Sequence, residues 1–411
     1  MEPRASKKLS RHTKKLVERI TSGKSPLINA VVAGVTTTDK TEFIHGHGLR
    51  DMNDPSSVVR DDDQFCLYSC TKSMTAMAAL ILYERGQLRL DVPVNNYLPM
   101  IDEIGKIDRG QVNKDDGSFI YPPERPVNKV TVRQLMLHTA GFSYAFLSKD
   151  YFRLAQGKFL GDSTVNPTRA FFTTSNIPLL FEPGTQWMYG YNIDWLGLVI
   201  EEVSGQRLGE FLHDNVYSKA GMVDTTFHLH DTSRLIKIHK RAPGTKKVTM
   251  MNAYQAPRDP PQDMGGQGGF STVEDYLKFI RIWLNYGTSP DTGANILSRA
   301  TVEYAIHNHL PPGIRVDFSN IEGVNLPKGL IADGFTLTGN AYNTTNYATG
   351  RPKGSIYWSG FANLYYWIDF TNGVGGFWAE QLMPFGDLYS ILNYIDFEKS
   401  VYEAVKSKAK I

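Results

Sequence analysis

A serine and a lysine three residues apart are the groups in this sequence best suited to chemistry. They stand in Ser69-Cys70-Thr71-Lys72, where a strongly patterned apolar segment begins. Side chains three residues apart share one face of a helix, so the Lys72 amine can reach the Ser69 hydroxyl. The positive end of a helix also favours an alkoxide. The pair fits a serine nucleophile activated by a lysine, although a helix cap followed by a solvated lysine has the same four residues.

The segment that follows this pair has the spacing of a helix. Its apolar residues recur at positions i, i+3, i+4, i+7 and i+8, and Gly86 ends the run as a C-terminal glycine does. The residues concerned are Met74, Met77, Ala78, Ile81 and Leu82. This helix would hold Ser69 and Lys72 on one side.

A third chemical group is the phenol of Tyr189, which lies just before a predicted helix over residues 193–203. A tyrosine in such a turn is normally a packing residue whose hydroxyl has a partner. Close to a lysine, however, a phenol has a lowered pKa and can carry the serine proton to a leaving group. Tyr189 is therefore the candidate partner of Ser69 and Lys72.

A fourth element is the strand end Trp358-Ser359-Gly360-Phe361. An edge strand beside a nucleophile can offer a backbone N–H group to an oxyanion, and a glycine lets that backbone approach closely.

Strand patterns lie at both ends of the chain. They cover residues 27–37 and 41–46 near the N-terminus, and residues 355–358, 364–370 and 376–382 near the C-terminus. A final helix follows Gly386, and residues 66–262 are mostly helical. This order predicts an α+β fold in which one antiparallel sheet is built from both termini and flanked by helices. Residues 1–65 and 263–411 would form the sheet domain, and residues 66–262 an inserted helical subdomain that carries Ser69, Lys72 and Tyr189.

Three segments have the composition of long loops, which in enzymes tend to be lids or pocket walls. They cover residues 105–128, 241–262 and 310–352.

The bulk composition argues against several classes of partner. The net charge of +2 gives no electrostatic case for nucleic acid, and no apolar run is long enough to span a membrane. The basic segment 1–24 has one thin apolar stripe, which predicts a docked surface helix. Two cysteines suggest a reducing, cytoplasmic compartment, and Cys70 is expected to be a small buried side chain. The last residues, Ala409-Lys410-Ile411, are similar to the Ser-Lys-Leu peroxisomal address.

In their order and separation, these elements resemble the serine β-lactamase-like superfamily, whose motifs are Ser-x-x-Lys, a Tyr-x-Asn-type turn and a Lys-Thr-Gly-type strand. Leu137-His138-Thr139-Ala140-Gly141 is similar to its His-Thr-Ser-Gly turn, and residues 265–272 to its glycine turn before a capped helix. Within the superfamily, the chain most resembles the bacterial esterases of this fold and the fungal lovastatin side-chain acyltransferases, and residues 189–197 and 138–147 are similar to segments of the acyltransferases. The resemblance implies a β-lactamase/transpeptidase-like fold.

The resemblance also implies roles. Ser69 would be the nucleophile, Lys72 and Tyr189 would share the acid–base work, and the backbone N–H groups of Ser69 and Phe361 would form the oxyanion hole. The substrate would lie against Trp358, Ser359, Gly360, Tyr191 and Tyr144. His138 would be a structural corner, and no metal or cofactor is implied.

One departure from the family bears on the substrate. Trp358 stands where penicillin-recognising relatives have the cation of Lys-Thr-Gly, which disfavours anionic lactams and favours neutral acyl esters. We therefore expect a serine ester hydrolase that acts through an acyl-enzyme on neutral short-to-medium acyl esters. The alternative is an acyltransferase that moves an acyl group from a thioester or ester to an alcohol. A second alternative is a non-catalytic binding protein of the same fold. The expected partner is a small-molecule acyl ester or thioester, with no nucleic acid or membrane, and the chain would be a monomer or weak homo-oligomer.

Overall fold

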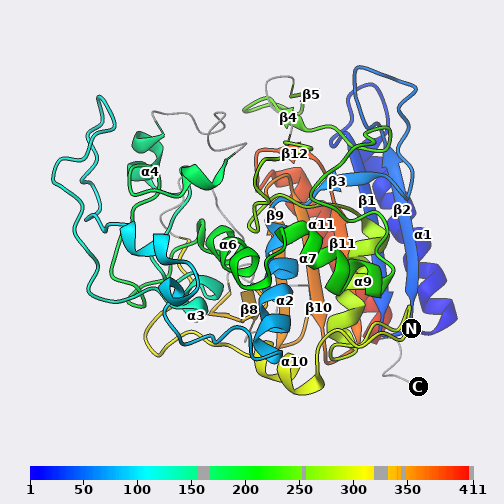
Figure 1. Ribbon diagram of the computed structural model, residues 1–411. Helices are drawn as coiled ribbons and strands as arrows, with labels where there is room; N and C mark the ends of the chain where they lie inside the picture. The colour runs from blue at the N-terminus through cyan, green and yellow to red at the C-terminus, as the bar shows by residue number, and fades with distance from the viewer. Residues whose placement is uncertain (156–166, 252–255, 319–331, 340, 344–348, 407–411) are drawn as a thin grey trace.

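A seven-stranded antiparallel sheet forms the framework of the computed structural model, which describes residues 1–155, 167–251, 256–318, 332–339, 341–343 and 349–406 (Figure 1). Its strand order is β2-β1-β11-β10-β9-β8-β7. The strands are β1 (Ala30–Thr37), β2 (Thr41–Gly48), β7 (Gly334–Phe335), β8 (Ala341–Asn343), β9 (Ser355–Gly360), β10 (Leu364–Asp369) and β11 (Val374–Ala379). Strands from the two ends of the chain meet where β1 pairs with β11. The predicted sheet is confirmed.

Helices cover both faces of the sheet, and its central strands are therefore buried on both sides. Neighbouring residues of a strand point to opposite faces. Tyr366 of β10 packs against Tyr276 of α9 (Val273–Leu284), whereas Trp367 packs against Phe397 of α11 (Leu388–Lys406). The space for α9 depends on Gly34 of β1, where a Cβ would lie 2.8 Å from a side-chain carbon of the helix. The sheet thus forms the middle of three layers, with α9 on one face and α11 on the other.

The basic N-terminal segment forms α1 (Pro3–Thr21), which lies beside α11 and β2 (Figure 1). Its apolar stripe is buried: Leu9, Leu16, Val17 and Ile20 are at most 3% exposed. The predicted docked surface helix is confirmed. The C-terminal tripeptide Ala409-Lys410-Ile411 lies outside the described residues.

The remaining helices lie between the two parts of the sheet in sequence. They are α2 (Thr71–Glu84), α3 (Val132–Met136), α4 (Lys149–Leu154), α6 (Asn192–Ser204), α7 (Leu208–Leu212), α8 (Ser218–Ala220) and α10 (Arg299–Ala305). Short turns of other helix types are η1 (Tyr68–Cys70), η2 (Val94–Asn96), η3 (Pro99–Glu103), η4 (Arg169–Phe171) and η5 (His213–Tyr217). The helix predicted to end before Gly86 is confirmed as α2, and the helix predicted over residues 193–203 is confirmed as α6.

Two small sheets modify the predicted organisation. One joins β12 (Leu382–Met383), β4 (His239–Arg241) and β5 (Val248–Met250), and the other joins β3 (Gln64–Cys66) to β6 (Phe270–Thr272). Segment 66–262 therefore contains strands as well as helices. The strand predicted over residues 376–382 is in fact two strands, because the buried polar residues Glu380 and Gln381 separate β11 from β12. Loop 310–352 contains β7 and β8, and part of it lies outside the described residues.

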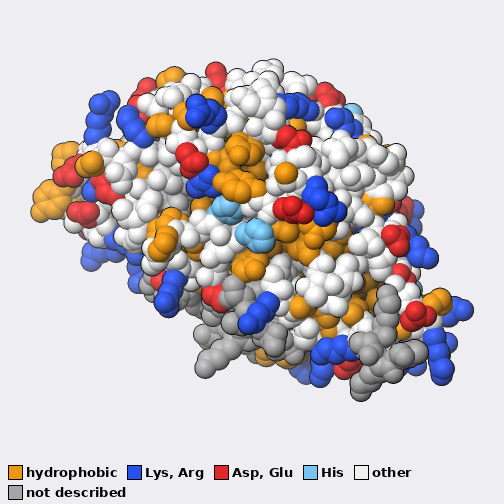
Figure 2. Space-filling model, turned by 90° about the horizontal axis from the view of Figure 1, so that it is seen from below, with side chains coloured by type: hydrophobic (Ala, Val, Ile, Leu, Met, Phe, Trp, Pro, Cys, Tyr) orange, Lys and Arg blue, Asp and Glu red, His pale blue; other side chains and the backbone are white. Residues whose placement is uncertain are grey.

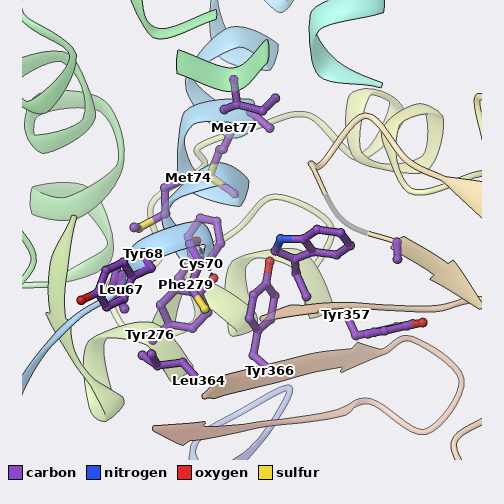
Figure 3. Packing of buried hydrophobic residues seen from close by; sticks show 14 of the residues in the cluster. Leu67, Tyr68, Cys70, Met74, Met77, Tyr276, Phe279, Tyr357, Leu364 and Tyr366 are labelled. Carbon is purple, nitrogen blue, oxygen red and sulfur yellow. Dashed lines mark hydrogen bonds between the residues drawn. The ribbon is translucent and has the colours of Figure 1, made fainter. Parts of the chain in front are cut away.

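The start of α2 is anchored to the sheet through α9. Figure 3 shows Cys70 beside Tyr276 of α9, whose ring contacts that of Tyr366 of β10, with Met74 further along α2. The Tyr276 hydroxyl also donates a 2.9 Å hydrogen bond to the Cys70 carbonyl. The turn that carries Ser69 is thereby fixed relative to β9 and β10.

The surface carries charges of both signs. On the face seen in Figure 2, acidic and basic side chains are interspersed among small apolar groups. Within the described part of the chain, no helix has the length and apolar character needed to cross a membrane.

Candidate active site

Ser69 lies in the short turn η1, immediately before α2. The helix proper begins at Thr71, two residues later than the sequence pattern indicated. Tyr68 has a φ of +46°, a left-handed conformation that is uncommon for a residue with a bulky side chain. Such backbone strain concentrates at functional sites. This turn places Ser69 in the lining of a cleft.

Lys72 is fully buried beneath Ser69 and has three polar neighbours. Its Nζ lies 3.2 Å from Ser69 Oγ, 3.0 Å from the Tyr144 hydroxyl and 2.7 Å from the Gly266 carbonyl oxygen. Burial lowers the pKa of Lys72 to about 7, and the charge of Asp194 opposes this shift. A lysine with such a pKa can serve as a general base at neutral pH.

The neighbours of Lys72 also determine the direction of its lone pair. A neutral amine has two N–H donors and one acceptor site. The Gly266 carbonyl can only accept, and the Tyr144 hydroxyl gives its proton to Asp194, so both accept from Lys72. The remaining lone pair then faces the Ser69 hydroxyl. The neutral lysine is arranged to take the serine proton.

Asp194, in the first turn of α6, links two of these neighbours. Its Oδ2 accepts a 3.0 Å hydrogen bond from the Tyr144 hydroxyl, and its Oδ1 accepts a 2.9 Å bond from the Gly266 N–H group. Burial raises the pKa of Asp194, and Lys72 opposes that rise. A Cβ at position 266 would lie 2.4 Å from Asp194 Oδ2, so the contact requires glycine there.

Sequence reasoning missed Asp194 and assigned Tyr144 only to the pocket wall. The available signal was an acidic residue within the otherwise apolar stretch 193–200, five positions after Tyr189. Tyr144 lines the cleft as predicted and also contacts Lys72.

Tyr189 lies against the same amine. Lys72 Nζ is 4.6 Å from the centre of its ring, and the Tyr189 hydroxyl accepts a 3.1 Å hydrogen bond from Trp358 Nε1. We expected the nearby lysine to lower the pKa of Tyr189; instead burial raises that pKa, and hydrogen bonds with Ser69 and Trp358 oppose the rise. The structure therefore brings Ser69, Lys72 and Tyr189 together.

His138 supports the tyrosine from behind. It is buried with a φ of +57°, and its ring centre lies 4.7 Å from that of Tyr189. Its Nδ1 lies 3.1 Å from the Asn192 side-chain amide nitrogen. Burial holds the pKa of His138 well below its ordinary value, so the ring is neutral. It is the structural corner that the sequence predicted.

The end of β9 passes close to the nucleophile turn. A Cβ at Gly360 would lie 2.6 Å from the Leu67 carbonyl oxygen, so the approach requires glycine. Phe361 follows, with its ring centre 6.1 Å from that of Tyr68. Trp358, which we expected at the substrate, instead points its indole at the Tyr189 hydroxyl.

The cleft above Ser69 has a volume of about 910 Å³, including its open mouth. Its described lining residues are Cys66, Tyr68, Ser69, Tyr144, Ala145, Phe146, Pro167, Tyr191, Ala256, Pro257, Pro260, Gln262, Met264, Gln267, Gly268, Phe270 and Phe361. Of the predicted substrate contacts, Tyr144 and Tyr191 belong to this lining, whereas Trp358, Ser359 and Gly360 do not. All of these described lining side chains are uncharged, and several are aromatic.

The two cysteines near Ser69 are both buried. Burial raises the pKa of the Cys66 thiol to about 12 and that of Cys70 well above its ordinary value. Both thiols are protonated at neutral pH, which makes them poor nucleophiles. Across the ranges that the structure describes, no group of three or more His, Cys, Asp or Glu side chains could hold a metal ion.

Known proteins show the same architecture. Acyltransferase calJ of Penicillium decumbens is 27% identical over 352 residues, which cover 81% of this chain and 79% of the relative. A lovastatin esterase of Penicillium rubens is 30% identical over 257 residues, which cover 61% of each chain. The solved structure of a simvastatin synthase variant from Aspergillus terreus, 24% identical, matches with a TM-score of 0.81 over 98% of both chains.

The family model described as Beta-lactamase matches residues 17–392, nearly the whole chain. The relatives carry both transferase and esterase names, and a serine mechanism is typical of the family. The chain belongs to the beta-lactamase family, as an enzyme of its serine hydrolase and acyltransferase type.

Proposed function

We propose that this protein is an acyltransferase that moves a neutral acyl group from a thioester or ester to an alcohol acceptor. The observation that carries the proposal is the contact of the buried Lys72 amine with the Ser69 hydroxyl, beneath a cleft whose described lining residues are uncharged. Sequence reasoning preferred ester hydrolysis. The names of the relatives support the transferase alternative better, because acyltransferases are prominent among them.

The proposed reaction has two halves. Ser69 Oγ attacks the acyl carbonyl while its proton passes to Lys72 Nζ. The backbone N–H groups of Ser69 and Phe361 bind the oxyanion, which collapses to an acyl-serine as the thiol or alcohol leaves with a proton delivered through Lys72 and Tyr189. The acceptor alcohol then attacks the acyl-serine, gives its proton to the same pair and departs as the new ester. Water in place of the alcohol would yield the free acid.

The lining of the cleft supports neutral substrates. A carboxylate or phosphate inside it would lose hydration without gaining a cationic partner from the described lining residues. Aromatic rings such as Tyr191 and Phe361 instead suit an apolar acyl chain. For the same reason, we expect the anionic lactam nitrocefin to be a far poorer acyl donor than a neutral thioester.

Product partition tests the proposal. The purified protein is supplied with S-butanoyl-N-acetylcysteamine, with and without a panel of neutral alcohols, and free butyrate and the butanoate ester of each alcohol are quantified by chromatography. We expect alcohols to raise the total turnover and ester to exceed free acid. Ser69→Ala removes the nucleophile, and Ser289→Ala is a matched control at a buried serine beyond α9.

Each result of this assay has a distinct meaning. Ser69-dependent turnover that yields only butyrate at every alcohol concentration would identify a hydrolase and overturn the transferase proposal. Turnover absent from the native protein, with no labelling of Ser69 by a fluorophosphonate, would favour the binding-protein alternative.

A further inference from the structure

A short strip of backbone, residues 380–386, is bonded to both chain segments that surround the nucleophile. We propose that Asn363 and Gln381 are positioning residues that fasten these two segments to that strip and so set the separation of the oxyanion-binding amides. The inference rests on the proposed function, in which the N–H groups of Ser69 and Phe361 bind the oxyanion. Neither side chain is among the residues that line the cleft.

Asn363 follows Phe361 by two residues and uses its whole side-chain amide. Its Nδ2 donates to the carbonyl oxygens of Leu382 at 2.7 Å and Pro384 at 2.9 Å. Its Oδ1 accepts from the Tyr365 hydroxyl at 2.7 Å and the Gly386 N–H group at 3.0 Å. Both donors and both acceptor sites of the amide are thereby filled.

The backbone of Asn363 is also specialised. Its φ is +62°, which Asn tolerates better than most residues, and the side chain is fully buried. Asn363 is the last of the three residues that turn the chain from β9 into β10, two residues after Phe361. The four hydrogen bonds fix this turn from outside the cleft.

Gln381 fastens the other segment to the same strip. Its Nε2 donates a 2.9 Å hydrogen bond to the Cys66 carbonyl oxygen, three residues before Ser69, and the side chain is fully buried. The next residue, Leu382, donates its N–H group to the Ala362 carbonyl oxygen at 3.2 Å. Two adjacent residues of the strip therefore contact both segments that would supply the amides.

The consequence is a constraint on distance. An oxyanion hole works only when both donors lie about 2.7–3.1 Å from the same oxygen, and loss of one donor lowers kcat about 10²–10³-fold. A site displaced by a fraction of an ångström loses a substantial part of that effect. We call the side-chain hydrogen bonds of Asn363 and Gln381, described above, the brace. Removing the brace should lower kcat, and it should leave KM nearly unchanged because neither side chain lines the cleft.

The test compares Asn363→Gly, Asn363→Asp and Gln381→Met with a matched control. Glycine keeps the left-handed backbone and removes the brace. Aspartate keeps the acceptors and places a carboxylate oxygen against two carbonyls. Asn285→Asp is the control, because Asn285 Nδ2 likewise donates to two carbonyl oxygens, of Thr38 at 2.7 Å and Arg281 at 2.9 Å, at the C-terminal end of α9.

The readouts are kcat and KM for Ser69-dependent butanoyl transfer, melting temperature, and affinity for an alkyl boronic acid that mimics the tetrahedral intermediate. We expect both Asn363→Gly and Gln381→Met to lower kcat and boronate affinity tenfold or more, with KM within about threefold. Asn285→Asp should have a lower melting temperature than the native protein and an unchanged kcat. The double variant should lose less than the product of the single losses, since both residues secure one strip.

The brace and the proposed function fail in different ways. Equal kcat in Asn363→Gly, Gln381→Met and Asn285→Asp at matched folded fraction would overturn the brace, while Ser69-dependent transfer still stood. If Asn363→Asp does not fold, Asn363→Gly and Gln381→Met still decide the matter. A protein with no Ser69-dependent turnover would instead overturn the proposed function.

Discussion

The charge of Asp194 should set the pH range in which Lys72 is an active base. Asp194→Asn keeps the shape of the side chain and removes its charge. Two hydrogen bonds of 3.0 Å each join Asp194 Oδ2 to Lys72 Nζ through the Tyr144 hydroxyl, so the two charged atoms are at most about 6 Å apart. The carboxylate therefore lies close enough to stabilise the protonated lysine.

The size of this effect follows from Coulomb's law. At about 6 Å and an effective dielectric constant of about 20, two unit charges interact by roughly 3 kcal/mol, equivalent to about two pKa units. The pKa of Lys72 is about 7 with Asp194 in place. Removing the carboxylate disfavours the ammonium form, so the pKa falls. We expect it to reach about 5 to 6 in Asp194→Asn.

The assay is the pH dependence of kcat/KM for acylation by a neutral thioester, whose own charge does not change over the range. Only the neutral amine accepts the serine proton, so kcat/KM rises through the pKa of Lys72. The acid limb of the variant should lie about one to two pH units below that of the native protein. The height of its plateau can also fall, because Tyr144 and Gly266 lose a charged acceptor.

Asp275→Asn is the matched control. Asp275 is also a buried carboxylate paired with a lysine, with Oδ1 3.1 Å from Lys278 Nζ, but it lies on α9 away from the cleft lining. Its acid limb should coincide with the native one. An acid limb in Asp194→Asn that stays in place or moves to higher pH would refute the coupling of Asp194 to Lys72.

Three further perturbations test separate parts of the site. Trp358→Phe removes the hydrogen bond to the Tyr189 hydroxyl, so kcat should fall about tenfold with KM little changed; an unaltered kcat would show that this hydrogen bond does not support the role of Tyr189. Gly360→Ala places a Cβ 2.6 Å from the Leu67 carbonyl oxygen. We expect the free energy of unfolding in urea to fall by about 1–3 kcal/mol and kcat/KM to fall at least tenfold. A fully active and equally stable variant would contradict the close approach of the two segments. Burial depresses the pKa of folded Lys72 from its ordinary 10.5 to about 7, so between these values the unfolded chain binds the additional proton and stability rises with pH. Relative to Lys72→Met, the native protein should therefore gain about 3 kcal/mol of unfolding free energy from pH 7 to 9.5, and a pH-independent difference would show that the amine is not buried as a neutral group.

The elements that depend on local spacing could be predicted from the sequence. The 3.6-residue period placed α2, and the helix predicted over residues 193–203 is α6; Gly86 and Gly205, at their C-terminal ends, both adopt positive φ values. The strand-like segments at the two termini predicted a sheet built from both ends of the chain, and the pairing of β1 with β11 confirms it. Ser69 and Lys72 could be paired because they lie one helical turn apart.

The parts that depend on distant contacts could not be predicted. Tyr144 and Asp194 are 50 residues apart in sequence, and nothing in their own neighbourhoods indicates that they meet. The positive φ of Tyr68 also has no sequence signal, because only the surrounding fold holds a bulky residue in that conformation. Trp358 has the apolar character of a pocket wall, yet its single N–H donor is used by Tyr189.

The most direct test of the central claim is to trap the acyl-enzyme. The native protein is mixed with S-butanoyl-N-acetylcysteamine, quenched in acid within one turnover, digested and analysed by mass spectrometry. We predict one butanoyl group on Ser69, absent from Ser69→Ala and strongly reduced in Lys72→Met. Butanoylation of another residue during turnover, or full turnover by Ser69→Ala, would contradict a serine nucleophile activated by the buried lysine.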